Sequence, residues 1–195
     1  TDEGAWAPDK TNIEILELLT EIKNKFYDEF KLRIDIGLDI AATSLWDGKY
    51  YAYNNFSKKK KKVKLSKEEQ INFVQELIDK YNLIYIEDPF EENDFFSFSK
   101  LKNTLVCGDD LICTNLQRLK KAKITAVVIK PNQIGSLIKT KEIVDYAKTN
   151  NIKTVFSHRS GETLDTTISH LAAGLKADFV KFGIHGKERE IKLKE

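Results

Sequence analysis

The stretch 125-TAVVIKPNQIGSLIKTKEIVDYAKTNNIKTVFS-157 decides the fold. Two short runs in it, 125–130 and 153–157, are rich in β-branched residues, and the segment between them, 137–149, has apolar residues at helical spacing. A strand, a helix and a second strand in this order predict two parallel strands joined by a helical crossover.

The same alternation continues toward both ends of the chain. Further strands are predicted at 34–41, 83–87, 104–108 and 178–182, and further helices at 13–26, 71–81 and 164–175. Ser66 and Glu69 form a capping box before the second of these helices. Asp47-Gly48, between aromatic-rich flanks, predicts a β-hairpin at 45–53. The pattern indicates an α/β fold, an open sheet or a barrel, in which helices cover the mostly apolar strands on both faces.

Composition bounds the class of protein. With 195 residues, 41% of them hydrophobic, the chain can bury one core, so residues 1–195 are predicted to form one domain. The 32 basic residues nearly balance the 30 acidic ones, which argues against nucleic acid or a membrane surface as the main partner. No apolar run approaches the length of a membrane span. The two cysteines, Cys107 and Cys113, form no CxxC pair, and no secretory signal opens the chain, so we expect a reducing, cytoplasmic location.

Five consecutive lysines, Lys58 to Lys62, leave two interpretations. They could form a nucleic-acid-binding patch or a nuclear signal. We favour a solvated loop, because like charges repel one another and extend the chain.

Ionisable residues end or directly follow six predicted strands in succession. A single aspartate after a strand is more often a helix cap than a ligand, but repetition on successive strands is hard to explain in that way. In β/α folds the carboxyl ends of parallel strands face the same side, where active sites are built. The residues at these positions are Asp39, Glu87, Asp88, Asp109, Asp110, Lys130, His158, Arg159 and Lys181.

These residue types suggest a chemistry. Clustered carboxylates repel one another unless a cation joins them, so Asp39, Glu87 and Asp109 are predicted to bind Mg²⁺, which prefers oxygen ligands. A lysine beside a metal and another cation loses its proton more readily, so Lys130 or Lys181 could act as a base. The alternative is that each lysine only pairs with one of the carboxylates. The loop 157-SHRSGET-163, with its arginine and serines, suits an anion such as phosphate. Together these parts describe proton abstraction next to a carboxylate.

The chain resembles the C-terminal barrel of the enolase family, the phosphopyruvate hydratases. Seven motifs carry the resemblance in the order of the family: 2-DEGAWAP-8, 37-GLDIAAT-43, 86-IEDPF-90, 108-GDDLICTN-115, 129-IKPNQIGS-136, 157-SHRSGET-163 and 180-VKFG-183. The resemblance implies a TIM-type β/α barrel, of which this chain covers roughly the last six strands. Enolase-superfamily sites are a known case of a lysine base working with Mg²⁺.

The resemblance also implies roles for individual residues. Lys130 matches the base that takes the C2 proton of 2-phosphoglycerate, and Glu3 matches the acid that helps hydroxide leave from C3. The Mg²⁺ ligands are then Asp39, Glu87 and Asp109, and the substrate contacts are His158, Arg159, Ser160 and Lys181. Glu162 is expected to support the loop. The implied activity is that of a lyase, the reversible dehydration to phosphoenolpyruvate, and the family commonly forms homodimers.

The sequence also departs from the family pattern. Ala5, Ser44 and Phe182 replace the usual residues of their motifs, and 184-IHGKERE-190 replaces an arginine-rich segment. Nothing in the sequence matches the capping domain or the first barrel strands, so we expect a part of a longer enolase. The alternative is a non-catalytic enolase-like protein with a binding or structural role.

Overall fold

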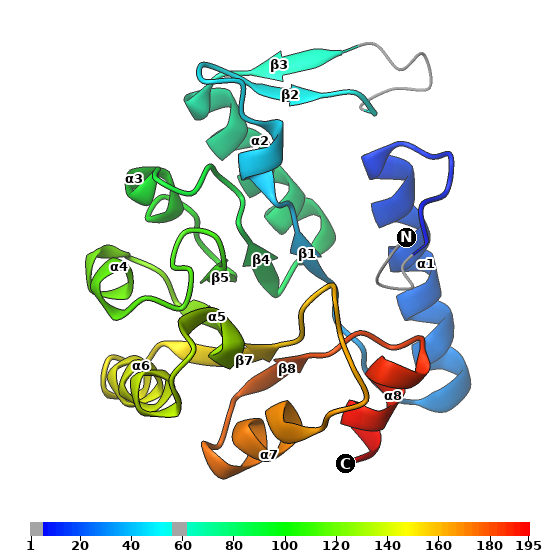
Figure 1. Cartoon of the computed structure of the whole chain (residues 1–195). Coiled ribbons are helices and arrows are strands. Elements are labelled where there is room, and N and C mark those ends of the chain that lie inside the picture. Colours follow the sequence, from blue (N-terminus) through cyan, green and yellow to red (C-terminus); the bar gives the residue numbers. More distant parts are fainter. Residues whose placement is uncertain (1–5, 56–61) are drawn as a thin grey trace. The chain divides into compact units, whose positions relative to one another are not determined.

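The computed structural model describes residues 6–55 and 62–195 (Figure 1). The chain divides into two compact units. One, called the first unit, is Pro8–Val106, and the other, called the second unit, is Cys107–Glu195 together with Trp6 and Ala7. The boundary between them falls within strand β5 (Leu105–Gly108).

In its described residues, 8–55 and 62–106, the first unit contains two long helices and two pairs of strands. Its two strand pairs are β1 (Gly37–Asp39) with β4 (Tyr85–Glu87), which are parallel, and β2 (Tyr51–Tyr53) with β3 (Val63–Leu65), which are antiparallel. The backbone N–H of Leu105, at the start of β5, donates to the carbonyl of Ile84 (3.0 Å). The helices of this unit are α1 (Asn12–Phe30), the short 3-10 helix η1 (Ala42–Leu45), α2 (Lys67–Tyr81) and the single turn α3 (Phe95–Phe98).

Local sequence signals fix where the two long helices begin and end. The hydroxyls of Thr11 and Ser66 accept the N–H groups of Glu14 and Glu69, and both glutamates reach back to complete capping boxes. Each helix ends at a residue in the left-handed conformation. The apolar stripe of α2 is buried, whereas α1 buries only Leu16.

The second unit consists of parallel strands with helices between them. After β5 come β6 (Ala126–Ile129), β7 (Lys153–Ser157) and β8 (Phe179–Lys181), which pair in this order. All four residues of β6 are buried, and α6 and α7 pack against β7. Strand β8 exposes Phe179 (41%) and Val180 (48%), which are consecutive and so point to opposite faces of the strand. The helices of this unit are α4 (Leu116–Lys121), α5 (Pro131–Ile134), α6 (Leu137–Thr149), α7 (Thr167–Gly174) and α8 (Lys187–Lys194).

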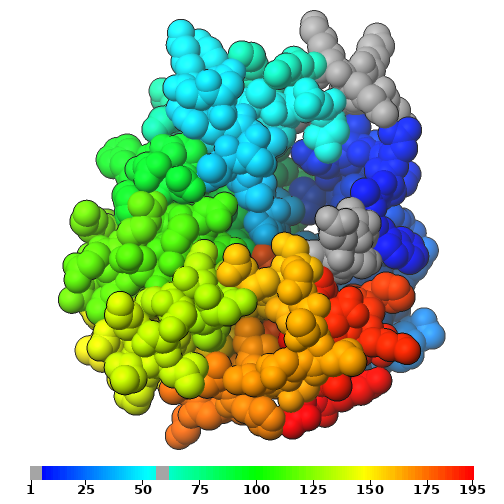
Figure 2. Space-filling model, in the orientation of Figure 1, coloured from blue at the N-terminus to red at the C-terminus, as the bar shows by residue number. Residues whose placement is uncertain are grey.

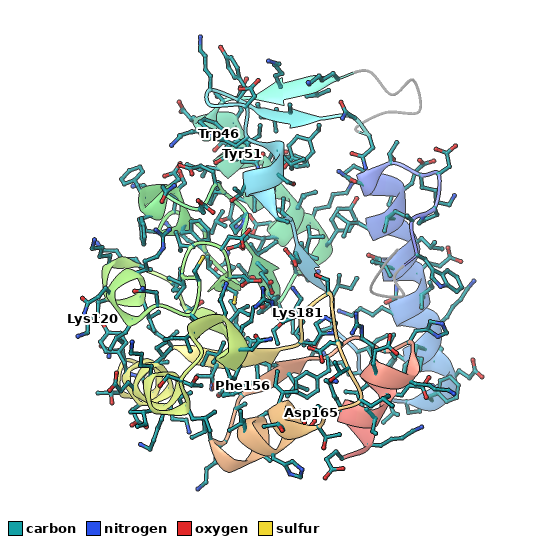
Figure 3. The ribbon with its side chains drawn as sticks, viewed as in Figure 1. Trp46, Tyr51, Lys120, Phe156, Asp165 and Lys181 are labelled. Atoms are coloured by element: carbon teal, nitrogen blue, oxygen red, sulfur yellow. The ribbon has the colours of Figure 1, made fainter. Side chains whose placement is uncertain are left out.

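The predicted elements are present, with shorter strands at most positions. Strand β7 and helix α6 have the predicted bounds, while β1 covers only three residues of the predicted 34–41. The hairpin at Asp47-Gly48 is reduced to one bridge between Trp46 and Tyr51, whose rings pack with centroids 4.7 Å apart (Figure 3). The main antiparallel pairing is instead β2 with β3, because three aromatic and apolar residues of β2 find their partners there.

Candidate active site

Two predicted metal ligands lie side by side in the first unit. Asp39 and Glu87 are the last residues of β1 and β4, and they are register partners in this parallel pair. The Asp39 carboxylate accepts the N–H of Ala41 (3.1 Å), and Glu87, which is 1% exposed, accepts the hydroxyl of Tyr85 (2.6 Å). Both carboxylates therefore stand at the carboxyl ends of neighbouring strands, as the sequence predicts.

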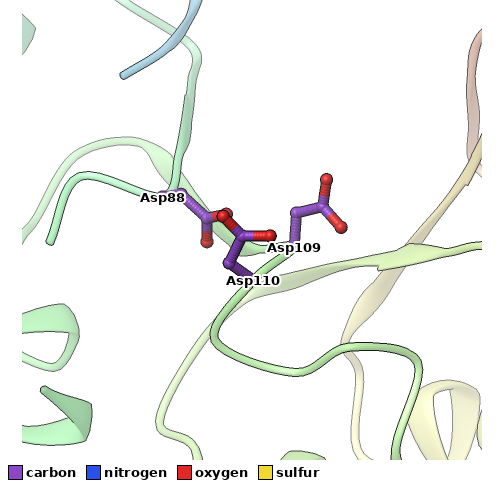
Figure 4. Close-up of side chains that lie close together, drawn as sticks. All are labelled: Asp88, Asp109 and Asp110. Atoms are coloured by element: carbon purple, nitrogen blue, oxygen red, sulfur yellow. The ribbon is translucent and has the colours of Figure 1, made fainter. Parts of the chain in front are cut away.

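The second unit brings a predicted ligand and the predicted base together. Asp109 follows β5 and Lys130 follows β6, the parallel neighbour of β5. The Lys130 ammonium donates to Asp109 Oδ2 over 2.5 Å, and the two side chains are 15% and 12% exposed. The lysine–carboxylate pairing left open by the sequence is thus formed at this site. Figure 4 draws Asp109 and Asp110, which directly follow β5.

A hydrogen-bonded chain holds the backbone at Lys130. The Thr114 hydroxyl accepts the N–H of Lys130 (3.0 Å) and donates to Gln133 Oε1 (2.8 Å). Thr114 is buried, and its φ of +47° is unusual for a β-branched residue. A strained backbone that persists beside an ionisable pair is typical of a functional site. Thr114 could not be recognised from the sequence alone, because a threonine in the loop after a strand carries no pattern of its own.

The loop after β7 joins the same edge of the second unit. Ser157 and Lys181 are register partners at the ends of β7 and β8, and the backbone N–H of His158 donates to the carbonyl of Lys181 (2.9 Å). Lys181, which Figure 3 labels, is the last residue of β8. The Arg159 guanidinium donates to Asn132 Oδ1 of α5 (3.3 Å). The strand ends thus bring His158, Arg159 and Lys181 to one edge of this unit.

A cavity of about 490 Å³ lies beside this loop. Arg159, Glu162 and Asn132 are among its lining residues, and so are residues of α7 and the start of α6. This volume is in the range of small-molecule sites. Asp109 and Lys130 do not line the cavity, so its volume alone does not define the chemical centre.

Glu162 is the acidic residue of the loop. Burial alone would raise the pKa of Glu162, but hydrogen bonds from the Lys192 ammonium (2.8 Å) and from the N–H of Arg159 (2.8 Å) outweigh it, and the pKa lies below its usual 4.5. Glu162 is therefore ionised at neutral pH and braces the backbone of Arg159.

Carboxylate oxygens are the ligands that Mg²⁺ prefers, and Asp39 and Glu87 present them at the ends of two paired strands of the first unit. In the second unit, the Asp109 carboxylate is paired with the Lys130 ammonium. Glu3 lies outside the described residues, as do four of the five lysines of the run from Lys58 to Lys62. Within residues 6–55 and 62–195, no helix is long and apolar enough to cross a membrane.

The parallel strands of this chain alternate with helices and carry carboxylates and lysines at their carboxyl ends. These features are typical of one class of protein, the β/α-barrel proteins, whose active-site face lies at the carboxyl ends of the strands. A family profile described as "Enolase, C-terminal TIM barrel domain" matches residues 1–194. The chain therefore belongs to the enolase family, and its α/β fold is that of the C-terminal TIM barrel domain.

Curated relatives agree with this assignment. The chain is 43% identical to the enolase of Methanocorpusculum labreanum, 43% to that of Archaeoglobus fulgidus and 42% to that of Pyrobaculum aerophilum. Each comparison covers 100% of this chain and 50%, 49% and 47% of the relative. The chain thus spans about half the length of the curated relatives it matches.

Proposed function

We propose that the protein to which this chain belongs catalyses the Mg²⁺-dependent, reversible dehydration of 2-phosphoglycerate to phosphoenolpyruvate, and so acts as a hydro-lyase of glycolysis and gluconeogenesis. The observation that carries the proposal is the contact of 2.5 Å between Lys130 Nζ and Asp109 Oδ2. Lys130 and Asp109 follow two neighbouring parallel strands, and a contact between them is what a base working beside a metal ligand would need, which supports the proposal. Membership of the enolase family supports the proposal.

Lys130 is the proposed base for the C2 proton. To accept a proton the side chain must be neutral, and in this structure its ammonium lies against the Asp109 carboxylate. Asp109 can neutralise either the Lys130 ammonium or a bound cation.

The other groups bind and orient the substrate. Lys181 is proposed to contact the substrate carboxylate, and Arg159 and Ser160 are proposed to contact the phosphate, with His158 beside them. A planar guanidinium suits two oxygens of a phosphate. Glu3 is proposed to protonate the hydroxyl that leaves from C3.

Asp39, Glu87 and Asp109 are proposed to hold Mg²⁺. The ion would supply positive charge where negative charge develops on the substrate carboxylate as C2 loses its proton. A second Mg²⁺ beside Ser160, a homodimeric state, a cytoplasmic location and a single barrel domain spanning 1–195 belong to the same proposal. No role for nucleic acid is proposed.

The proposal is tested by measuring turnover of 2-phosphoglycerate by the full-length protein. Formation of phosphoenolpyruvate from 2-phosphoglycerate should require Mg²⁺ and should stop with a chelator. A folded protein without metal-dependent turnover would contradict the proposal and favour the non-catalytic alternative.

Lys130→Ala tests the assigned base. Loss of a general base slows proton transfer by on the order of 10²- to 10⁴-fold, so exchange of the C2 proton with solvent should fall by that factor. Lys141→Ala is a matched control, because Lys141 lies on α6 in an exposed ion pair with Asp145 and should leave exchange unchanged. If the C2 proton still exchanges in Lys130→Ala, another residue is the base.

A further inference from the structure

The conformation of the loop 158–163 is tied to the last helix of the chain. In Figure 2 the orange surface of this loop borders the red surface of α8. Three side chains make the connection: Glu162 from the loop, and Arg189 and Lys192 from α8. All three belong to the second unit.

Lys192 is buried and fully bonded. Its side chain is 1% exposed, and its ammonium contacts Glu162 Oε2 (2.8 Å), the carbonyl of Thr163 (2.7 Å) and the carbonyl of Glu188 (2.8 Å). An ammonium has three N–H donors, so these partners account for all of them. A buried charge is stable only when it is paired in this way, and Lys192 therefore holds two consecutive residues of the loop in fixed positions.

Glu162 passes this restraint on to Arg159. One oxygen of its carboxylate accepts Lys192, and the other accepts the backbone N–H of Arg159 (2.8 Å). The position of the Arg159 backbone therefore depends on where Lys192 holds Glu162. Arg159 itself lines the cavity beside the loop.

Arg189 restrains the middle of the loop. Its Nη2 donates to the carbonyl of Ser160 (3.1 Å), and its side chain packs over Gly183, which follows β8. Arg189 is 1% exposed, and its Nε and Nη1 have no hydrogen-bond partner in residues 6–55 and 62–195. Burying such donors is unfavourable, so stability alone does not account for an arginine at this position.

We propose that Lys192 and Arg189 are positioning residues, which hold the loop 158–163 so that Arg159 and Ser160 present their polar groups to the phosphate of the substrate. This inference rests on the proposed function. Neither residue is placed in contact with the substrate. Both act through the loop.

A displaced loop weakens phosphate contacts in the substrate complex and in the transition state alike. Loss of such uniform binding raises KM more than it lowers kcat. In the full-length protein, Lys192→Met should raise KM for 2-phosphoglycerate by on the order of tenfold. Lys192→Arg keeps the charge opposite Glu162 and should restore part of the loss. Lys194→Met is the matched control, because Lys194 lies on the same helix with its side chain 76% exposed, and KM should not change.

Amide hydrogen exchange separates this inference from the proposed function. Lys192→Met should speed exchange of the backbone N–H groups of 158–163, and Lys194→Met should not. This measurement needs no turnover, so it still decides the inference if the wild-type protein proves inactive.

Two outcomes would overturn the inference. One is a folded Lys192→Met protein whose loop exchanges at the wild-type rate. The other applies if Lys192→Met does not fold. Glu162→Gln, which keeps the shape of the side chain, is then the test variant and should speed amide exchange of the loop 158–163. An unchanged exchange rate in Glu162→Gln would refute the positioning role.

Discussion

At the scale of the residue, Gly183 lies where a side chain would collide with the restraint on the loop. Its φ is +72°, and an added Cβ would lie 2.7 Å from Arg189 Cδ and 3.1 Å from His158 Cε1. Gly183→Ala should therefore lower the free energy of unfolding by about 1–3 kcal/mol, through strain and displacement of Arg189.

Denaturant unfolding measures this effect against a glycine without such contacts. Gly174, the last residue of α7, would find nothing within 4 Å of an added Cβ. Gly174→Ala should be neutral or stabilising by up to about 1 kcal/mol, because alanine favours helix. If the two substitutions change the free energy of unfolding equally, Arg189 moves away from the new side chain without loss of stability.

The residue scale also shows how far the sequence predicts the site. The strand-end positions of Asp39, Glu87, Asp109 and Lys130 could be predicted, because each residue ends or follows an apolar run that is visible in the sequence. Arg189 and Lys192 could not, because nothing in 184-IHGKEREIK-192 reveals that these charges are buried against a loop some thirty residues earlier (29 for the contact of Arg189 with Ser160).

At the scale of the element, hydrophobic periodicity predicts the presence of a helix or strand better than it predicts the residues at which that element begins and ends. Helix α6 matches its predicted bounds because Ser136 caps its start and its apolar stripe is regular. Strand β1 is shorter than predicted, since only Gly37–Asp39 pairs with β4. An apolar run in the sequence does not show how many of its residues form backbone hydrogen bonds with a neighbouring strand. Strands β2 and β3 pair although the lysine run separates them in the sequence. A turn signal such as Asp47-Gly48 predicts pairing only between the segments directly beside it, so it could not predict this pair.

The pair of strands β7 and β8 should be sensitive to acid through Asp178. Burial alone would raise the pKa of Asp178, but hydrogen bonds from Lys153, and from the N–H and hydroxyl of Thr154, lower it below its usual 3.8. A lowered pKa in the folded state stabilises the protein above pH 3.8, and this contribution is lost as the pH falls through the folded-state pKa.

Asp178→Asn should consequently destabilise the protein most at neutral pH, by about 1 kcal/mol, since the pair with Lys153 is partly exposed. Urea unfolding of wild type and variant at pH 7 and at pH 3 measures the difference. The gap between the two proteins should narrow at pH 3. A gap that is constant across this range would mean that the charge of Asp178 contributes nothing and only its shape matters.

At the scale of the whole molecule, the proposed Mg²⁺ ligands Asp39, Glu87 and Asp109 are separated by tens of residues along the chain. Carboxylates so far apart in sequence form no preset site in an unfolded chain. A cation that needs all three should therefore bind the folded protein only and stabilise it by mass action.

Mg²⁺ at a hundredfold excess over its dissociation constant should raise the free energy of unfolding of the protein, as its gene encodes it, by about 2.7 kcal/mol. Thermal unfolding with Mg²⁺ and with chelator measures the increase. Asp39→Asn removes one charged ligand while keeping a side chain that can accept the N–H of Ala41, so most of the increase should disappear. Asp145→Asn, in an exposed pair on α6, should retain it. If Asp39→Asn responds to Mg²⁺ as wild type does, Asp39 is not a ligand, and the cation site must be sought among other carboxylates.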